Sequence, residues 1–168
     1  MAAPDRADRT ARRRRSSGGT AVVSISAKVD YGVRVLCALA DADGAMTAVQ
    51  LAGSQGLPHK YLEAILNDLR RAALVTSKRG THGGYRLARP ASEISLADAV
   101  RPLVDSLAEV RGYEIGRTRY DGPAENLGTA WTVVSTALES SLDQVTIADV
   151  VSGDLPGPPT GTGAHPVP

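Results

Sequence analysis

The stretch from Leu57 to Arg89 constrains the fold of this chain most, because it predicts a short helix that runs directly into a hairpin. Pro58 is tolerated in the first turn of such a helix. From Lys60 onward, apolar residues recur every three or four positions, so one side of the helix packs and the other stays free. The packed positions are Leu62, Ile65, Leu66, Leu69 and Ala73, and the free positions are Lys60, Glu63, Asn67 and Arg71.

The helix is expected to end by Leu74, where Leu-Val-Thr-Ser introduces residues that favour strands. The next residues, 78–84, read Lys-Arg-Gly-Thr-His-Gly-Gly, and their glycines permit a tight turn. Residues 85–87 can then return antiparallel to the first strand. The sequence therefore predicts a two-stranded wing whose cationic tip carries Lys78, Arg79 and His82.

A helix with a free polar face followed by a basic hairpin fits duplex DNA. The helix matches the major groove, where base edges carry a distinguishable pattern, and a thin cationic tip suits phosphates or the minor groove. Taken alone, however, the same residues are equally well explained as an ordinary amphipathic helix with a solvated hairpin. The preceding part of the chain shifts the balance.

Two further helices are predicted before this stretch. Ser26 is placed to cap a helix from Ser26 to Ala40, and Thr47 to cap a shorter one over residues 48–55 that Gly56 stops. The apolar repeat of the first helix consists of Val29, Val33, Leu36 and Ala40. Helix, short helix, tight turn, helix and wing is the order of a winged helix-turn-helix, whose third helix reads DNA.

The predicted fold class is therefore mainly α, with a winged helix-turn-helix domain and a two-stranded wing over residues 23–107. Ser95 can cap a fourth helix that reaches about Val104 and that Pro102 must bend or shorten. Residues 108–126 are predicted to form a loop, and residues 127–151 a long C-terminal helix with a short helical cap.

The C-terminal helix is predicted from apolar residues that recur every three or four positions over about five turns. This apolar seam consists of Leu127, Trp131, Val134, Leu138, Leu142 and Val145. Because such a helix is remote from the compact core, the seam needs a partner. Thr146 can cap a final short helical turn after it.

Charge is distributed unevenly along the chain. Counting Lys and Arg against Asp and Glu, residues 1–90 carry 15 and 7, a net charge of +8, whereas residues 91–168 carry 4 and 11, a net charge of −7. The first half is therefore suited to a polyanion. Residues 1–22 are expected to form a disordered basic arm, whose arginines 12–15 are either phosphate contacts or solvated charge, and residues 152–168 a disordered tail.

Several function classes are disfavoured. No apolar run approaches the roughly 20 residues of a membrane span, and no cleavable signal pattern is present, so a cytoplasmic protein without a membrane partner is expected. The single cysteine, Cys37, excludes an intrachain disulfide and is expected to be a small buried hydrophobe. The histidines, His59, His82 and His165, form no catalytic or ligand spacing, so neither a catalytic residue nor a metal site is predicted.

The chain contains five short motifs: Ile25 to Arg34, Tyr61-Leu62-Glu63 with Leu66, Leu69-Arg70-Arg71-Ala72, Lys78-Arg79-Gly80, and Gly83 to Pro90. Together these motifs resemble the Rrf2 (Rrf-two) family of bacterial transcription regulators. The resemblance is clear over roughly residues 24–107 and continues more weakly to Val151.

The resemblance implies a homodimer that pairs through its long C-terminal helix, and a closed two-fold pair is also the commonest oligomer. We expect such a dimer to bind a palindromic operator in double-stranded DNA as a transcriptional regulator, and to repress. The resemblance also implies that Lys60, Tyr61 and Glu63 read the DNA and that Arg79 contacts the DNA from the wing. Tyr61 lies at the boundary between the two faces of its helix, so a packing role is a serious alternative.

Further DNA contacts are expected from cations and polar side chains near this surface. They are Asn67, Arg71, Lys78, His82, Lys28 and Arg34. For Arg34, together with Tyr31 on the same predicted helix, holding a phosphate and supporting the structure are equally weighted alternatives.

The sequence departs from the best-studied members of the family in one respect. Those members resemble one another in a loop with three cysteines that binds an iron-sulfur cluster, whereas residues 112–128 here contain no cysteine. Even a dimer supplies only two copies of Cys37, so no iron-sulfur cluster and no other cofactor is expected. The resemblance to family members that lack these cysteines implies an unidentified small-molecule or protein effector.

Three functions stay open at this point, and the DNA-binding regulator leads. The second is a protein-interaction module whose winged helix binds a protein partner such as a metabolic enzyme. The third is a small enzyme. A steep loss of affinity for a palindromic DNA fragment with rising salt would identify the first, because bound cationic side chains displace counterions from phosphates.

Overall fold

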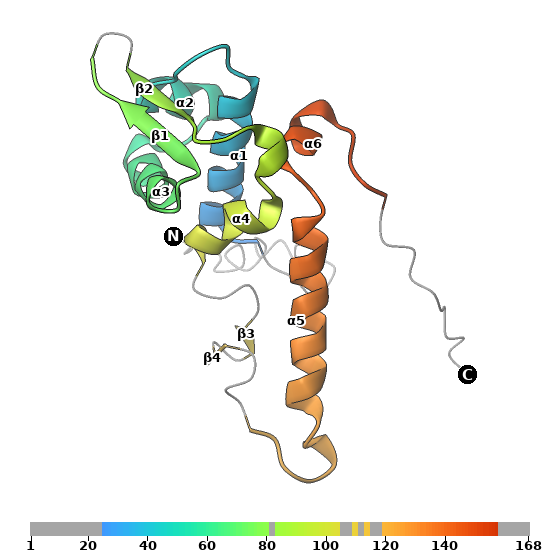
Figure 1. Ribbon diagram of the computed structural model, residues 1–168. Coiled ribbons are helices and arrows are strands. Elements are labelled where there is room, and N and C mark those ends of the chain that lie inside the picture. The colour runs from blue at the N-terminus through green and yellow to red at the C-terminus, as the bar shows by residue number, and fades with distance from the viewer. Residues whose placement is uncertain (1–24, 81–82, 105–108, 111–112, 115–118, 158–168) are drawn as a thin grey trace, which may run out of the picture.

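The computed structural model describes residues 25–80, 83–104, 109–110, 113–114 and 119–157, and it confirms the expected fold class. The chain is mainly helical, with a two-stranded antiparallel wing (Figure 1). The expected arm and most of the expected tail lie outside the described residues. The elements, in chain order, are α1 (Ala27–Asp41), α2 (Ala48–Gln55), α3 (His59–Arg71), β1 (Val75–Lys78), β2 (Gly84–Leu87), η1 (Ala91–Glu93), α4 (Leu96–Val100), η2 (Arg101–Leu103), β3 (Glu109–Val110), β4 (Tyr113–Glu114), η3 (Gly122–Ala124), α5 (Leu127–Asp143) and α6 (Ile147–Ser152).

Helix α1 lies at the centre of the domain and begins at the predicted cap. The Ser26 hydroxyl accepts a hydrogen bond from the Val29 N–H at 3.3 Å, which satisfies one of the free donors of the first turn. Of the predicted apolar repeat, Val29 and Leu36 are buried, and Val33 and Ala40 are partly buried and pack against the core. Val35 and Leu39, which lie outside that repeat, are also buried.

Helices α2 and α3 form the expected helix-turn-helix. Thr47 and Gln50 make a reciprocal capping box at the start of α2, and Gly56, with φ 63°, ends that helix in a left-handed conformation. The predicted core face of α3 is confirmed for Leu62, Ile65, Leu66 and Leu69, which are all buried. Ala73 is a correction: the helix has ended at Arg71, and Ala73 is exposed with φ 55°.

The wing follows α3 directly. Strands β1 and β2 pair in the register Val75↔Leu87, Thr76↔Arg86, Ser77↔Tyr85 and Lys78↔Gly84. Met46, which precedes α2, pairs with Tyr85 through two main-chain hydrogen bonds of 3.0 and 2.8 Å. The base of the wing is therefore held against the loop between α1 and α2.

The fourth helix forms in two parts, as the position of Pro102 predicts. Ser95 caps α4, whose α-helical part ends at Val100, and η2 continues as a 3-10 turn that contains Pro102. The predicted loop over residues 108–126 is not wholly irregular, because β3 and β4 pair as a short antiparallel ladder. A short ladder of this kind carries no periodic sequence signal.

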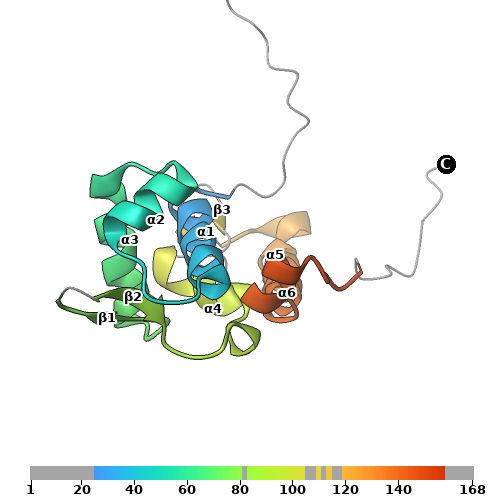
Figure 2. The same cartoon turned by 90° about the horizontal axis from the view of Figure 1, so that it is seen from above.

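Helix α5 projects from the domain, and α6 returns to it (Figures 1 and 2). The N–H of Leu96 bonds to the carbonyl of Val145 at 2.7 Å, and the N–H of Ile147 bonds to that of Ile94 at 2.9 Å. The Ile147 side chain is fully buried, and α6 packs against α1. The predicted seam is wrong at its last position: Val145 lies beyond the end of α5, in the connection that turns the chain toward α6.

Candidate nucleic-acid interface

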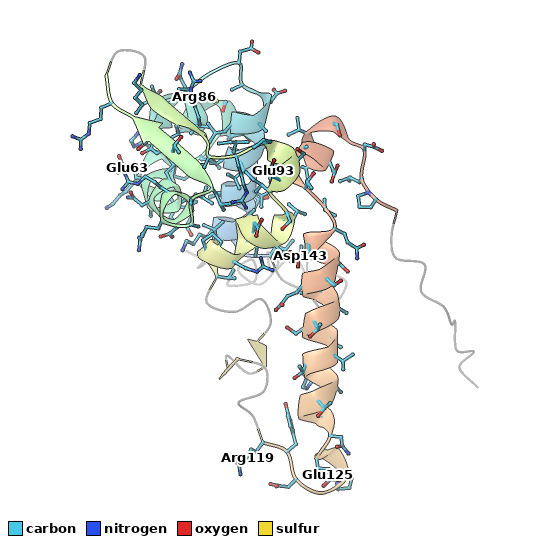
Figure 3. The ribbon with its side chains drawn as sticks, viewed as in Figure 1. Glu63, Arg86, Glu93, Arg119, Glu125 and Asp143 are labelled. Atoms are coloured by element: carbon cyan, nitrogen blue, oxygen red, sulfur yellow. The ribbon has the colours of Figure 1, made fainter. Side chains whose placement is uncertain are left out.

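The free face of α3 presents three of the predicted readers to the exterior. Lys60, Glu63 and Asn67 are all exposed, opposite the buried side of the helix. Among the described residues Lys60 has no ion-pair partner, and Glu63 has only His59, whose Nδ1 is 3.9 Å from its Oε1. Glu63 lies on the outer flank of the domain (Figure 3). The Lys60 ammonium and the Glu63 carboxylate are exposed to an external ligand, whereas Oδ1 of Asn67 accepts a hydrogen bond from Nη2 of Arg70 at 3.3 Å.

Tyr61 lies between the two faces of α3, as its position in the helix predicts. Its side chain is 43% exposed, and its ring meets the ring of Tyr31 edge-on, with centroids 5.8 Å apart and an interplanar angle of 88°. An edge-to-face pair of this kind orients the phenol ring while leaving its rim accessible. Tyr61 therefore packs against Tyr31 and is also partly exposed to the exterior.

Two predicted cations, Lys28 and Arg71, converge on one carboxylate. The Nζ of Lys28 lies 2.8 Å from Oδ2 of Asp68, and Nη2 of Arg71 lies 3.0 Å from Oδ1 of the same side chain. Asp68 thus ties the start of α1 to the end of α3. Arg71 is 78% exposed at its side chain, so its guanidinium also reaches the exterior.

Arg34 is engaged in holding two helices together. Its guanidinium donates to the carbonyl and to the side-chain oxygen of Gln55, and it lies 3.5 Å from the carboxylate of Asp30. The same group stacks over Tyr31, with 5.9 Å between its Cζ and the ring centroid. Of the two alternatives for Arg34, these contacts favour structural support.

The tip of the wing carries exposed Lys78 and Arg79, while His82 lies outside the described residues. The turn needs its glycines, because Gly80 has φ 109° and a Cβ at residue 83 would overlap the Lys78 carbonyl. No carboxylate occurs in the sequence between Asp68 and Glu93, so the whole wing is cationic. In Figures 1 and 2 the wing and α3 lie on one flank of α1, and α5 and α6 lie on the other.

Comparison with known proteins identifies this arrangement. The family model for Rrf2, described as an iron-dependent transcriptional regulator, matches residues 25–153. The chain belongs to the Rrf2 family of transcriptional regulators. The Mycobacterium tuberculosis (strain H37Rv) protein Rv1287, provisionally named as an HTH-type transcriptional regulator, is 42% identical over 134 residues, which are 79% of this chain and 83% of that protein.

Solved structures of Rrf2 regulators share the fold. IscR of T. potens has 32% sequence identity and a TM-score of 0.65, over 82% of this chain and 92% of that one. CymR (YrzC), the global cysteine regulator of B. subtilis, has 29% identity and a TM-score of 0.61, over 78% and 98%. This Rrf2 chain is thus a regulator with a helix-turn-helix and a wing.

The residues of this Rrf2 chain do not fit the iron-sulfur cluster known from its family. A cluster needs several thiolates, and the chain has one cysteine, Cys37, which lies on α1 and is partly buried. Burial raises the pKa of this thiol, and the thiol form is a poor ligand. Within the described ranges no group of three His, Cys, Asp or Glu side chains is placed to hold a metal ion.

Among the helices that the structure describes, none is long and apolar enough to cross a membrane.

Arg86, which is exposed on the wing, was assigned no role by the sequence analysis. Arg86 occurs within the Gly83 to Pro90 motif, but its position opposite Thr76 places it beside Lys78 on the outer face of the wing. The signal that identifies it is the hairpin register, because directly opposed residues of two strands project to the same side. Without the register, Arg86 is one more arginine in a basic stretch.

Proposed function

We propose that this Rrf2 regulator is a homodimeric, cytoplasmic repressor that binds a palindromic operator without an iron-sulfur cluster. The observation that carries the proposal is the common flank of α3 and the wing, where a free polar helix face lies beside a strand pair that has cations and no carboxylate. A reading helix and a cationic hairpin on one side of a domain can contact the major groove and an adjacent phosphate or minor groove together.

The roles follow from the chemistry of each side chain. Lys60 is cationic and can donate hydrogen bonds to acceptors on base edges, whereas Glu63 can accept hydrogen bonds from donors there. Asn67 can do either. Tyr61 offers its hydroxyl from a ring oriented by Tyr31. Lys78 and Arg79 meet phosphates or the minor groove.

The remaining cations act mainly by orienting the readers. Lys28 and Arg71 fix α3 through Asp68, and exposed Arg71 also lies within reach of a phosphate. Arg34 fixes the end of α2 through Gln55. These contacts hold the helix-turn-helix rigid, which is the condition for reading base edges.

The homodimer is proposed from the surface of α5. No side chain of this helix is buried, residues 127–138 carry no charge, and Val133 and Val134 are 64% and 53% exposed. An exposed apolar helix on a projecting arm is typical of an interaction surface. A second copy that packs its α5 against this one would cover the seam formed by Leu127, Trp131, Val134, Leu138 and Leu142.

The signal is proposed to be a small molecule or a protein rather than a cluster. CymR, named as a global cysteine regulator, is a relative of similar fold. A metabolite of cysteine or sulfur chemistry is therefore the first class to screen.

Operator binding is tested with duplexes selected from a random pool by the wild-type chain. We expect Arg79→Ala to weaken binding to every selected duplex. Glu63→Ala should instead relax base preference at one position per half-site, by about 1–3 kcal/mol, because an acceptor to a base edge is removed. The matched controls are Arg119→Ala and Glu125→Ala, which remove the same charges at the far end of α5 (Figure 3).

Wild-type affinity should fall steeply with salt, because phosphate contacts release counterions. Binding curves that are unchanged for both Arg79→Ala and Glu63→Ala would count against the assignment. A wild-type chain that selects no duplex at all would favour the protein-interaction module instead.

The dimer is tested by sedimentation velocity. Leu138→Glu should yield monomers, because a carboxylate on the seam would be desolvated against its copy. Thr136→Glu is the control, since Thr136 is exposed and lies about half a turn away from the seam. A Leu138→Glu chain that stays dimeric would place the pairing surface elsewhere.

A further inference from the structure

The outer face of the wing is a surface distinct from its tip. Alternate residues of a strand share a face, and directly opposed residues project together, so the register places Thr76, Lys78 and Arg86 on one side of the hairpin. Val75, opposite Leu87, points to the other side and is 2% exposed. The core therefore lies behind the wing, and Thr76, Lys78 and Arg86 face outward.

A hollow forms on this outer face, where the loop before α2 comes close to the strands of the wing. Gly84 has φ 143°, and a Cβ there would lie 2.7 Å from the Met46 carbonyl oxygen, so only glycine allows the two segments to meet. The Met46–Tyr85 hydrogen bonds hold them together. An open hollow of about 570 Å³ results, lined by Ala45, Thr76, Ser77, Lys78, Gly84 and Arg86.

The lining of this wing hollow is that of an anion site. It offers the Lys78 ammonium, the Arg86 guanidinium and the Thr76 hydroxyl, and it contains no carboxylate. Arg86 is exposed and has no ion-pair partner within the described part of the chain. Its Nη2 lies over the loop, 3.8 Å from where a Cβ on Gly44 would be. Figure 3 shows Arg86 on the wing, apart from Glu63 on α3.

We propose that the wing hollow, with Arg86 and Lys78 as its cations and Thr76 as a donor, binds a backbone phosphate of operator DNA. The proposal rests on the proposed function and adds a phosphate contact separate from the bases read by α3. Duplex DNA is the occupant favoured by the structure, because the hollow is open and is continuous along β1 with Arg79 at the wing tip. A polyanion can contact both cations of such a surface, whereas an open site binds a single free anion weakly.

The test compares Arg86→Gln with Arg119→Gln, which removes the same charge from the far end of α5. On a duplex selected by the wild-type chain, Arg86→Gln should lower affinity about three- to tenfold. It should also reduce the slope of log K against log salt by about 0.9 for each phosphate that the side chain no longer neutralises. Base preference should be unchanged, because a phosphate carries no sequence information. Arg86→Lys should retain most of the affinity.

Ethylation interference locates the bound phosphate directly. Ethylation of one phosphate per half-site should impair binding of the wild-type chain and should have no effect on Arg86→Gln. If Arg86→Gln matches Arg119→Gln in both slope and interference pattern, the inference is wrong while the proposed function stands. If the wild-type chain shows no preference for any duplex, the proposed function itself fails.

A third arm separates DNA phosphate from a free anion. Calorimetry with inorganic phosphate, without DNA, should show no saturable binding below millimolar concentration. Tight phosphate binding that disappears in Arg86→Gln would assign the hollow to a small anion and overturn the DNA proposal.

Discussion

Ile147→Ala tests whether the end of the chain is part of the DNA-binding unit. Ile147 is the one fully buried side chain of α6 in the structure as described, and it lies among residues of α1 and η1. Truncating a fully enclosed Ile to Ala costs about 2–5 kcal/mol, from reduced burial and from the cavity left behind. We expect about 3 kcal/mol, which in a chain of this size lowers the Tm by roughly 10 °C.

Urea unfolding followed by helical circular dichroism measures this effect. Val151→Ala is the matched control, because Val151 lies on the same helix and is 40% exposed, so its truncation should change stability by less than about 0.5 kcal/mol. All chains must be compared at one protomer concentration, since dimerisation would add to apparent stability.

Equal urea midpoints for Ile147→Ala and Val151→Ala would refute the reasoning. They would mean that α6 contributes little to stability and that α5 is anchored instead by its contacts with α4 and by the Arg101–Asp143 pair. A large, selective loss of stability at Ile147 would instead show that α5 leaves and re-enters one cooperative unit.

Two further predictions concern α1. Gly32→Ala should destabilise the domain by about 1–3 kcal/mol, because the added methyl group overlaps Leu103 Cδ1 in a packed core. In urea unfolding, the double variant Gly32→Ala with Leu103→Ala should lose less stability than the sum of the two single losses, because the truncated Leu103 makes room for the methyl group. Burial raises the pKa of Cys37, so the folded chain keeps this thiol proton to higher pH than the unfolded chain; stability should fall as pH rises through that window. Alkylation of the folded chain near pH 8 should be slower than in urea, and equal rates would contradict the burial.

Local patterns in the sequence predicted most of the helix-turn-helix and the wing. The spacing of Leu62, Ile65, Leu66 and Leu69 identifies the buried face of α3 because a regular helix has one period and one core side. The caps at Ser26, Thr47, Ser95 and Thr146 were also predictable, since a cap depends only on residues three positions away.

Contacts between distant residues were not predictable in this way. Lys28 pairs with Asp68, and Arg34 bonds to Gln55. Ile147 of α6 is buried where α6 packs against α1. Each of these contacts joins elements that are far apart in the sequence. Periodicity shows which side of an element packs, but not which charged group it meets. The sequence therefore predicted a DNA contact for Lys28 and left Arg34 between a phosphate contact and structural support, whereas both side chains make intramolecular contacts in the structure.

One connection between the proposed dimerisation helix α5 and the helix-turn-helix runs through a chain of ion pairs, in addition to the packing of α4 on α5 and of α6 on α1. Asp143, at the end of α5, lies 3.3 Å from Arg101 of η2, and Arg101 also pairs with Asp98, which pairs with Arg89. Leu103 of the same turn packs against Gly32 of α1, and η2 contacts α3. A displacement of α5 about its base must therefore either break the Arg101–Asp143 pair or move η2. Because η2 contacts α3, moving it would alter the separation of the two reading helices in a dimer, and with it the fit to a palindrome of fixed spacing.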